Sequence, residues 1–460
     1  MQLDRRHALV AGMAGAGIVG AGLGVPGATT VAAAAPNGRD RASRAETIVP
    51  PAELGLVIGS EADQIVALQR AIDTAQAAGR PLSLPPGRYV TGPLRLKAGA
   101  RLIGAHGLTR LVASDGGPLL SARAADDLVI ADISLDGARA TNDVVRLDDC
   151  ARVAIEGLDI DAGDAPVNGL VMARVSGRVS ACRIAGAGLA GLFCRDANGL
   201  VISGNTIERC ANNGILVWRE IAGEDGTQVI ANRISGIAAR DGGSGQNGNG
   251  INVFRADGVI VSGNVIVDCA YSAVRGNAAS DILIANNRCA GIGEVALYAE
   301  FGFEGAVITG NIVDRAATGI AVTNFDRGGR LAVVQGNLVR NLFRREHEPV
   351  DKRGEGITVE ADAAVTGNTI EEAPSAGIMV GWGPYLRDVA VNGNVIRRAR
   401  TGILISDRAG GASCLVSGNL IAGVMEGAIR RMDHGRGVGP DLAREAAGAG
   451  GLVVTGNIAS

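Results

Sequence analysis

The stretch Val201-Ile202-Ser203-Gly204-Asn205-Thr206-Ile207 decides the fold of this chain. Its pattern of aliphatic residues around a Gly-Asn pair returns about every 25 residues, which is typical of a solenoid with loop insertions in some units. Copies lie around Asn232, Asn264, Asn287, Asn311, Asn337, Asn368, Asn394, Asn419 and Asn457, and earlier copies at 129–135, 153–160 and 179–184 keep the frame without the Asn.

The short apolar runs in each repeat alternate as strands do and lack the 3.6-residue spacing of helices. Ile251-Asn252-Val253-Phe254 and Ile357-Thr358-Val359-Glu360 are two such runs. Three short strands joined by turns make one coil of a parallel β-helix, and parallel crossovers are right-handed. The sequence therefore predicts an all-β, single-stranded, right-handed parallel β-helix of about 12–13 coils.

The Gly-Asn pair has a structural role in this prediction. Asn tolerates the left-handed backbone conformation that a tight bend requires, so we expect it to form the bend. Side-chain amides stacked one coil above the next, about 4.8 Å apart, are expected to hydrogen-bond along the axis.

The composition supports thin aliphatic layers and excludes several classes of protein. Gly accounts for 69 of 460 residues, and aromatic residues make up 3% against 47% hydrophobic residues. A net charge of −3 without a basic block excludes nucleic acid as an expected partner. The seven cysteines are odd in number and show no CxxC spacing, so we expect buried thiols. No metal site and no cofactor are predicted.

The N-terminus resembles an export signal. Arg5-Arg6 precede an apolar, Gly-rich run over residues 8–25, and small residues at 31–35 offer a cleavage site. We expect a twin-arginine signal over residues 1–35 and a linker over 36–59. The export machinery is then a partner, and the mature protein is periplasmic or secreted, without stable membrane insertion after cleavage. A retained membrane anchor or a short buried helix are the alternatives.

Residues 60–460 are predicted to form one domain whose first element, 60–79, is a capping helix. Ser60 and Asp63 resemble a capping box, apolar residues follow at helical spacing, and Gly79 marks the end. A solenoid leaves its first coil open, and an amphipathic helix laid across that end covers the core and the unpaired backbone groups.

With these features the chain resembles the pectin-lyase-like β-helix superfamily, through residues 63–104 and the Gly-Asn coils. The Arg5-Arg6 signal joined to the repeat resembles, more narrowly, a family of twin-arginine-translocated repeat proteins of unknown function. Many superfamily members cleave, epimerise or bind acidic polysaccharides, but the narrower family implies no catalytic residue. The clustered Asp ligands of pectate lyases and the Asp and His motifs of polygalacturonases have no match here.

Outward positions on the strand after each bend suggest a groove in the middle coils. Two insertions, 237–249 and 341–355, would wall it if both stand on the same side. The acid/base candidates are Glu294, Glu300, Glu355 and Glu360, with Arg275 beside them. The expected saccharide-binding residues are Arg219, Arg255, Tyr271, Tyr298 and Asn324, because tyrosines stack on sugars and arginines pair with carboxylates.

The predicted function is an exported β-helix protein that binds a polysaccharide or oligosaccharide in this groove. The alternative is an enzyme (a lyase, glycoside hydrolase or epimerase) acting on uronic-acid-type glycans. A second cluster ends in Asp433-His434, a pair that suits either proton transfer or a C-terminal cap containing a helix over 441–448.

Overall fold

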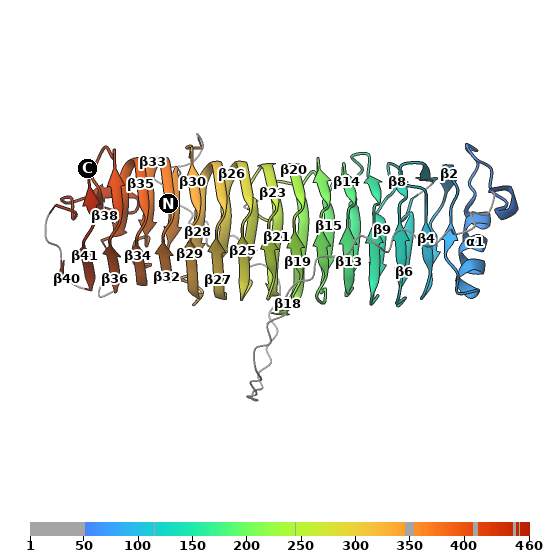
Figure 1. Ribbon diagram of the computed structural model, residues 1–460, viewed down its shortest axis with the longest axis horizontal. Helices are drawn as coiled ribbons and strands as arrows, with labels where there is room; N and C mark the ends of the chain where they lie inside the picture. Colours follow the sequence, from blue (N-terminus) through green and yellow to red (C-terminus); the bar gives the residue numbers. More distant parts are fainter. Residues whose placement is uncertain are drawn as a thin grey trace, which may run out of the picture. The chain divides into compact units, whose positions relative to one another are not determined.

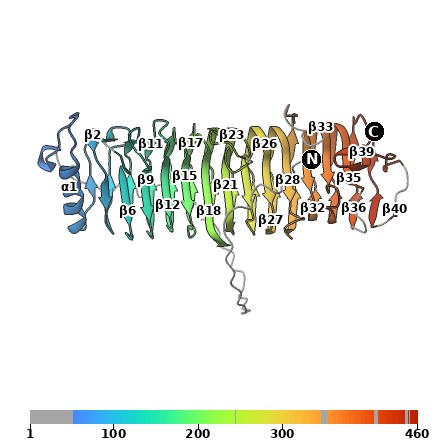
Figure 2. The same cartoon turned by 180° about the vertical axis from the view of Figure 1, so that it is seen from behind.

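The computed structural model describes residues 51–114, 116–243, 245–345, 354–407, 413–444, 448–449 and 451–460. The expected signal (1–35) and the linker up to residue 50 lie outside these residues. The described chain is nearly all-β and winds into a parallel β-helix of about 13 turns, in which successive coils lie side by side in chain order (Figures 1 and 2). The predicted fold class is thus confirmed.

Each coil contributes three short strands, and strands of one kind pair with the next coil in parallel. The first strands are β1 (Leu82–Ser83), β4 (Arg101–Ile103), β7 (Val129–Ala131), β10 (Val153–Glu156), β13 (Gly177–Ser180), β16 (Val201–Ser203), β19 (Gln228–Ile230), β22 (Ile260–Ser262), β25 (Ile282–Ala285), β27 (Glu304–Thr309), β29 (Arg330–Gln335), β32 (Ala361–Thr366), β34 (Arg387–Asn392), β36 (Cys414–Ser417) and β41 (Leu452–Thr455), with β40 (Gly448–Ala449) antiparallel to β41. The second strands are β2 (Gly87–Thr91), β5 (Thr109–Ala113), β8 (Ser134–Asp136), β11 (Asp159–Asp161), β14 (Arg183–Ala185), β17 (Thr206–Glu208), β20 (Arg233–Ile237), β23 (Val265–Cys269), β30 (Leu338–Arg340), β37 (Leu420–Ala422) and β42 (Ile458–Ala459).

The third strands are β3 (Leu94–Leu96), β6 (Leu120–Arg123), β9 (Asp143–Asp148), β12 (Asn168–Ala173), β15 (Ala190–Arg195), β18 (Asn213–Glu224), β21 (Asn249–Asp257), β24 (Val274–Asn277), β31 (Glu355–Val359) and β38 (Ile429–Asp433). In four coils the second and third strands form one continuous element: β26 (Arg288–Glu300), β28 (Ile312–Thr323), β33 (Thr369–Val380) and β35 (Val395–Ser406). The short β39 (Arg436–Val438) turns back antiparallel to β38.

The core consists of three aliphatic stacks, one under each kind of strand. Ile202 of β16, Ile207 of β17 and Ile215 of β18 are all fully buried and continue into equivalent residues of the next coil. Because a residue meets its own equivalent every 4.8 Å, small branched side chains pack without gaps. The seven cysteines are buried and free, as predicted, and burial raises the pKa of the Cys182 thiol to about 11.

A continuous asparagine ladder runs through the second half of the solenoid. The side-chain Oδ1 of Asn337 accepts hydrogen bonds from the backbone N–H of Asn311 (3.0 Å) and from its Nδ2 (2.9 Å). The same bonds join Asn205, Asn232, Asn264, Asn287, Asn311, Asn337, Asn368, Asn394, Asn419 and Asn457 in order. The expected register of equivalent residues between coils is confirmed.

The residue before each Asn, and not the Asn itself, has the left-handed conformation at the bend. This corrects the expectation that Asn forms the bend. Gly204 has φ of +65° and Gly336 has +64°, whereas neither Asn205 nor Asn337 has a positive φ. Where that Gly is missing, Ala231 and Asn286 take the positive φ in its place. The Gly thus makes the turn and frees the Asn side chain for the ladder.

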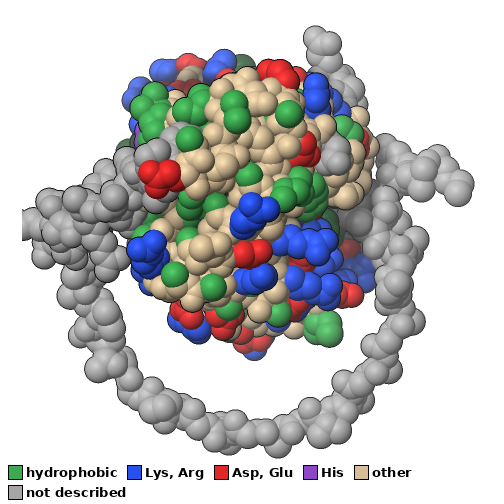
Figure 3. All heavy atoms as spheres, turned by 90° about the vertical axis from the view of Figure 1, so that its right-hand side faces the viewer, with side chains coloured by type: hydrophobic (Ala, Val, Ile, Leu, Met, Phe, Trp, Pro, Cys, Tyr) green, Lys and Arg blue, Asp and Glu red, His purple; other side chains and the backbone are tan. Residues whose placement is uncertain are grey.

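The first coil is covered by α1 (Ile65–Ala77), which buries Leu68, Ala71 and Ile72 against the core. Gln69 of this helix accepts a hydrogen bond from Arg95 N and donates one to Arg95 O, both 2.9 Å long. These bonds satisfy the backbone N–H and C=O of Arg95 in β3, which has no strand of a preceding coil to pair with. Figure 3 looks onto this end, where charged and apolar side chains are mixed.

The helix is shorter than the predicted range 60–79 and is not held by a capping box. Asp63 Oδ1 accepts from Ile65 N at 2.7 Å, whereas Ser60 bonds only Ala62 N. The end of the expected linker is structured, because Pro51–Leu54 form the 3-10 helix η3 and Leu56 is buried in the core. Near the other end, residues 441–444 form a turn instead of the expected helical start.

We expect N337A to lower the free energy of unfolding by at least about 2 kcal/mol, because it leaves the backbone N–H of Asn311 buried without an acceptor and removes the donors to Ile308 O and Asn368 Oδ1. Urea denaturation followed by circular dichroism measures the change. N198A, which truncates an exposed Asn outside the ladder, is the matched control. Equal midpoints for the two variants would refute a stabilising ladder.

Candidate functional site

The side chains that point outward from the third strands form a single surface, the third-strand face, from β15 to β38. Strand register fixes its two parallel columns of side chains. One column reads Phe193, Leu216, Asn252, Arg275, Tyr298, Ala321, Thr358, Met379, Leu404 and Arg430, and the other reads Arg195, Trp218, Phe254, Asn277, Glu300 and Thr323.

A buried charged cluster of Arg275, Asn277, Tyr298 and Glu300 occupies the middle of this face. Arg275 pairs with Glu300, with Nε donating to Oε1 at 2.5 Å, and Asn277 Nδ2 donates to the same oxygen at 2.7 Å. Arg275 is 5% exposed and Glu300 2% exposed. The pair joins adjacent coils, because Asn277 and Glu300 are direct register partners. The predicted candidates Arg275, Tyr298 and Glu300 therefore do lie together.

Burial controls the acid–base properties of this cluster. Desolvation raises the pKa of the Glu300 carboxyl above its ordinary value, although the Arg275 guanidinium and hydrogen bonds from Tyr298 and Asn277 act in the opposite sense. Burial also raises the pKa of Tyr298, whose hydroxyl hydrogen-bonds Thr323. A raised pKa favours the protonated form of the carboxyl, and such a shift is common in groups that act as general acids or bases.

Both insertions contact Tyr271 beside this part of the face, so they stand on the same side, as the condition for a groove required. The Tyr271 hydroxyl donates to Gly243 O of the first insertion at 2.9 Å. Arg345 of the second insertion lies 5.7 Å from the centre of the Tyr271 ring, and its Nη1 is 3.8 Å from Glu294 Oε1. Glu294 is 7% exposed and thus, like Arg275 and Glu300, lies beneath the surface.

The first insertion packs directly onto the arginine of the cluster. A Cβ added to Gly245 would lie 2.5 Å from Arg275 Nη1, so only Gly fits at this contact. Beside it, Asn252 Oδ1 and Ser272 Oγ are buried without a hydrogen-bond partner among the described residues. Asn252 is the register partner of Arg275. Buried polar atoms of this kind are costly unless a ligand or water satisfies them.

The remaining candidates on the C-terminal side of the cluster hold the backbone. Both amide atoms of Asn324 bond the backbone of Ala361, at 2.8 and 3.0 Å, which assigns this buried side chain a structural role. Glu360 accepts from Phe325 N at 3.1 Å, and Glu355 accepts from the Thr318 hydroxyl at 3.3 Å. These contacts tie neighbouring coils together.

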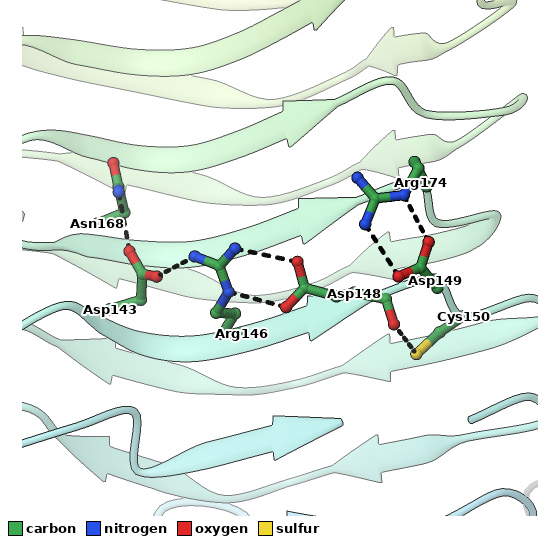
Figure 4. Close-up of polar contacts among 7 residues, drawn as sticks. All are labelled: Asp143, Arg146, Asp148, Asp149, Cys150, Asn168 and Arg174. Carbon is green, nitrogen blue, oxygen red and sulfur yellow. Dashed lines mark hydrogen bonds and ion pairs between the residues drawn. The ribbon is translucent and has the colours of Figure 1, made fainter. Parts of the chain in front are cut away.

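The arginines expected on the N-terminal side are engaged with the chain itself. Arg219 donates to Ala197 O and Ile221 O, both at 3.3 Å. Arg255 is exposed, donates to Glu220 O at 3.1 Å and lies 4.8 Å from the centre of the Phe254 ring. On β9, Arg146 pairs with Asp148 within one coil, and in the turns that follow β9 and β12, Arg174 pairs with Asp149 between coils (Figure 4).

Two groups of aromatic rings flank the buried charged cluster and were missed at the sequence level. The aromatic row consists of Phe193, Trp218 and Phe254, with ring centres 5.5 Å apart at each contact. The aromatic strip consists of Phe325, Tyr385, Trp382 and His434, with Phe325–Tyr385 at 5.5 Å and Trp382–His434 at 5.4 Å. All these side chains are half-buried, so each keeps an accessible part.

A signal for these rings exists in the sequence. The chain has only two Trp, four Tyr and six Phe, and all except Tyr89 lie between Phe193 and Tyr385. Inward positions belong to small aliphatic residues, so most of these rings must lie outside the core.

The described residues contain no group of three or more His, Cys, Asp or Glu residues placed to hold a metal ion. Within the same residues, α1 and the other helical segment are too short or too polar to cross a membrane.

Comparison with known proteins gives the fold. A family model described as right handed beta helix region matches residues 168–339 and 220–387. The chain is a right-handed parallel β-helix. No curated protein sequence matches it. Among solved structures, the catalytic unit of an α-1,3-glucanase from Streptomyces thermodiastaticus is similar, with 17% identity, a TM-score of 0.50, and 89% of this chain and 68% of that chain covered.

Two other β-helix structures resemble the chain less closely. A mannuronan C-5 epimerase module from Azotobacter vinelandii shares 16% identity with a TM-score of 0.39, covering 88% of this chain and 98% of that chain. A surface adhesin of Streptococcus pneumoniae shares 14% identity with a TM-score of 0.39, covering 83% and 92%. At these identities the similarities concern the fold alone.

Asp225, next to Arg219, predicts a pH dependence of stability. Burial raises the pKa of this carboxyl, which is 2% exposed and bonds the Thr227 hydroxyl at 2.5 Å. Between the ordinary and the raised pKa the folded chain binds more protons than the unfolded chain, so the free energy of unfolding falls as pH rises. D225N removes this contribution.

Between the ordinary and the raised pKa of Asp225, we therefore expect the free energy of unfolding of wild type to fall by up to about 1.4 kcal/mol per pH unit relative to that of D225N. Urea unfolding at steps from about pH 4 to about pH 7 measures the difference. D326N, at an exposed carboxylate, should keep the wild-type slope. Parallel curves for wild type and D225N would contradict the assignment.

Proposed function

We propose that this protein binds an extended saccharide along the third-strand face. The observation that carries the proposal is the placement of the aromatic rings. The aromatic row lies on one side of the buried charged cluster and the aromatic strip on the other. Ring faces stack on the apolar faces of sugars, and polar groups between them can bond hydroxyls.

The dimensions of this face suit a chain of several sugars. From β15, which carries Phe193, to β33, next to Trp382, the third strands pair over seven steps. At about 4.8 Å per step, this is a distance of about 34 Å. The α-1,3-glucanase of similar fold acts on a glucan, which agrees with a saccharide as ligand.

We expect the double variant W382A/Y385A to weaken saccharide binding about tenfold or more. Each ring stack contributes about 0.5–1.5 kcal/mol, and about 1.4 kcal/mol corresponds to a factor of ten. Affinity electrophoresis against alginate, polygalacturonate, α-glucan and β-glucan identifies the ligand, and calorimetry measures its affinity.

L331A is the control for this experiment, because Leu331 is an exposed apolar residue of β29 on another side of the coil. Circular dichroism verifies that all variants fold. If W382A/Y385A binds every polysaccharide as wild type and L331A do, or if wild type binds none of them, the proposal is wrong.

A second candidate function is catalysis on the bound saccharide. The specific observation in its favour is the Glu300 carboxyl, which is buried with a raised pKa between Arg275 and Asn277. Glu300 would act as general acid or base, while Arg275 would hold its carboxylate in place. Lyase, hydrolase and epimerase reactions all need such a proton transfer.

We expect E300Q to lower the rate of this reaction at least about 100-fold, because the amide cannot transfer a proton. Absorbance of a new double bond reports a lyase, new reducing ends report a hydrolase, and proton NMR of the sugar reports an epimerase. E304Q, at an exposed Glu of β27 that pairs with Arg330, serves as control. Wild-type rates in E300Q, or no turnover by wild type, would reject catalysis at Glu300.

A further inference from the structure

A cavity of about 420 Å³ lies at the C-terminal part of the third-strand face, between β33, β35 and the β38–β39 hairpin. Its polar lining comes from three arginines, two hydroxyl residues and one carboxylate: Arg400, Arg430, Arg436, Ser375, Thr401 and Glu426. We call it the arginine cavity. Gly435 and Gly437 of the hairpin line it as well, so no side chains from these positions fill it.

The lining has more positive than negative charge. Glu426 accepts from Arg400 Nε at 2.7 Å, which neutralises one of the three guanidinium groups. Arg430 donates to two backbone oxygens, Gly439 O at 2.9 Å and Glu426 O at 3.4 Å. The carboxylate of Asp441 is directed elsewhere, because it accepts from the backbone N–H groups of Ala428 and Ile429.

Arg436 is exposed, and its side chain has no hydrogen-bond or ion-pair partner among the described residues. Arg430, in contrast, is held by its hydrogen bonds to Gly439 O and Glu426 O, and its guanidinium lies against Gly437. The cavity thus combines two guanidinium groups, those of Arg430 and Arg436, that pair with no carboxylate of the described residues. Guanidinium groups in such a pair are suited to an oxyanion, which they bind through parallel N–H donors.

The arginine cavity is continuous with the aromatic strip. Leu404, which lines the cavity, packs in one apolar cluster with Met379, Met432 and Trp382. On the other side, His434 of the strip is followed in the chain by Gly435 and Arg436 of the cavity lining. A sugar chain lying on Trp382 can therefore reach the cavity with its next residues.

We infer that the arginine cavity binds the carboxylate of a uronic acid unit, so that the saccharide of the proposed function is acidic. This inference rests on that function, because the sugar chain is positioned by the aromatic strip. It assigns the recognition of charge to Arg430 and Arg436. Arg219 and Arg255 donate to backbone oxygens, and Arg275 is paired with Glu300.

The test compares a galacturonate hexamer with its fully methyl-esterified form, which has the same length without the charge. Calorimetry measures both affinities for the full chain, for R436Q and for R397Q. Arg397 is an exposed arginine of β35 that does not line the cavity, so R397Q loses the same charge elsewhere. We expect wild type to bind the acid at least tenfold more tightly than the ester, and R436Q alone to lose this preference.

Each outcome separates the two proposals. If wild type binds acid and ester equally, or if R436Q keeps the preference for the acid, the inference is overturned and saccharide binding stands. If the acid binds with Arg436 dependence but W382A/Y385A leaves its affinity unchanged, the cavity binds anions and the proposed role of the strip falls. If neither hexamer binds and the polysaccharides of the earlier panel do not bind either, both proposals fail.

Discussion

The structure depends on one hydrogen bond pattern, in which the Oδ1 of each ladder Asn accepts from the Asn one coil before it. This contact fixes the vertical register of the chain to a single residue. From Asn205 onward, the ladder therefore sets which residues of adjacent coils lie one above the other in each aliphatic stack and each outward column. A side chain in one coil therefore has predictable neighbours above and below.

The same register explains why function belongs to the outer surface. A core in which Ile207 must match Ile184 below and Ile234 above leaves space for aliphatic side chains of one size. Large rings such as Trp218 and Phe254 fit better outside, where the pairing that holds the core also sets their separation. Because the inward positions stay aliphatic, the repeats differ mainly in their outward residues, and these form the columns on the third-strand face.

The repeat made much of this structure predictable. The ladder follows from vertical register, which also places Arg275 and Glu300, 25 positions apart, on adjacent coils. The cap was predicted from helical spacing, and the buried cysteines from their odd number and lack of CxxC spacing. The closeness of Phe325 and Tyr385 could not be read in the same way, because insertions and turns of unequal length separate them. The burial of Glu300 and Arg275 depends likewise on the conformation of the first insertion, which packs on Arg275 at Gly245. This insertion lies outside the repeat, so the period does not predict its conformation.

Every ladder amide has the same orientation along the axis: its Oδ1 accepts from the N-terminal coil, and its Nδ2 donates to the Asn of the C-terminal coil and to a backbone carbonyl of the N-terminal coil. A whole unit, such as the one from Asn311 to Asn337, could therefore be duplicated or lost while the junction reforms the same bonds. Lineages of such chains can change in length by steps of one coil. The length of the third-strand face, and with it the length of ligand that the face can contact, would then change by one coil at a time.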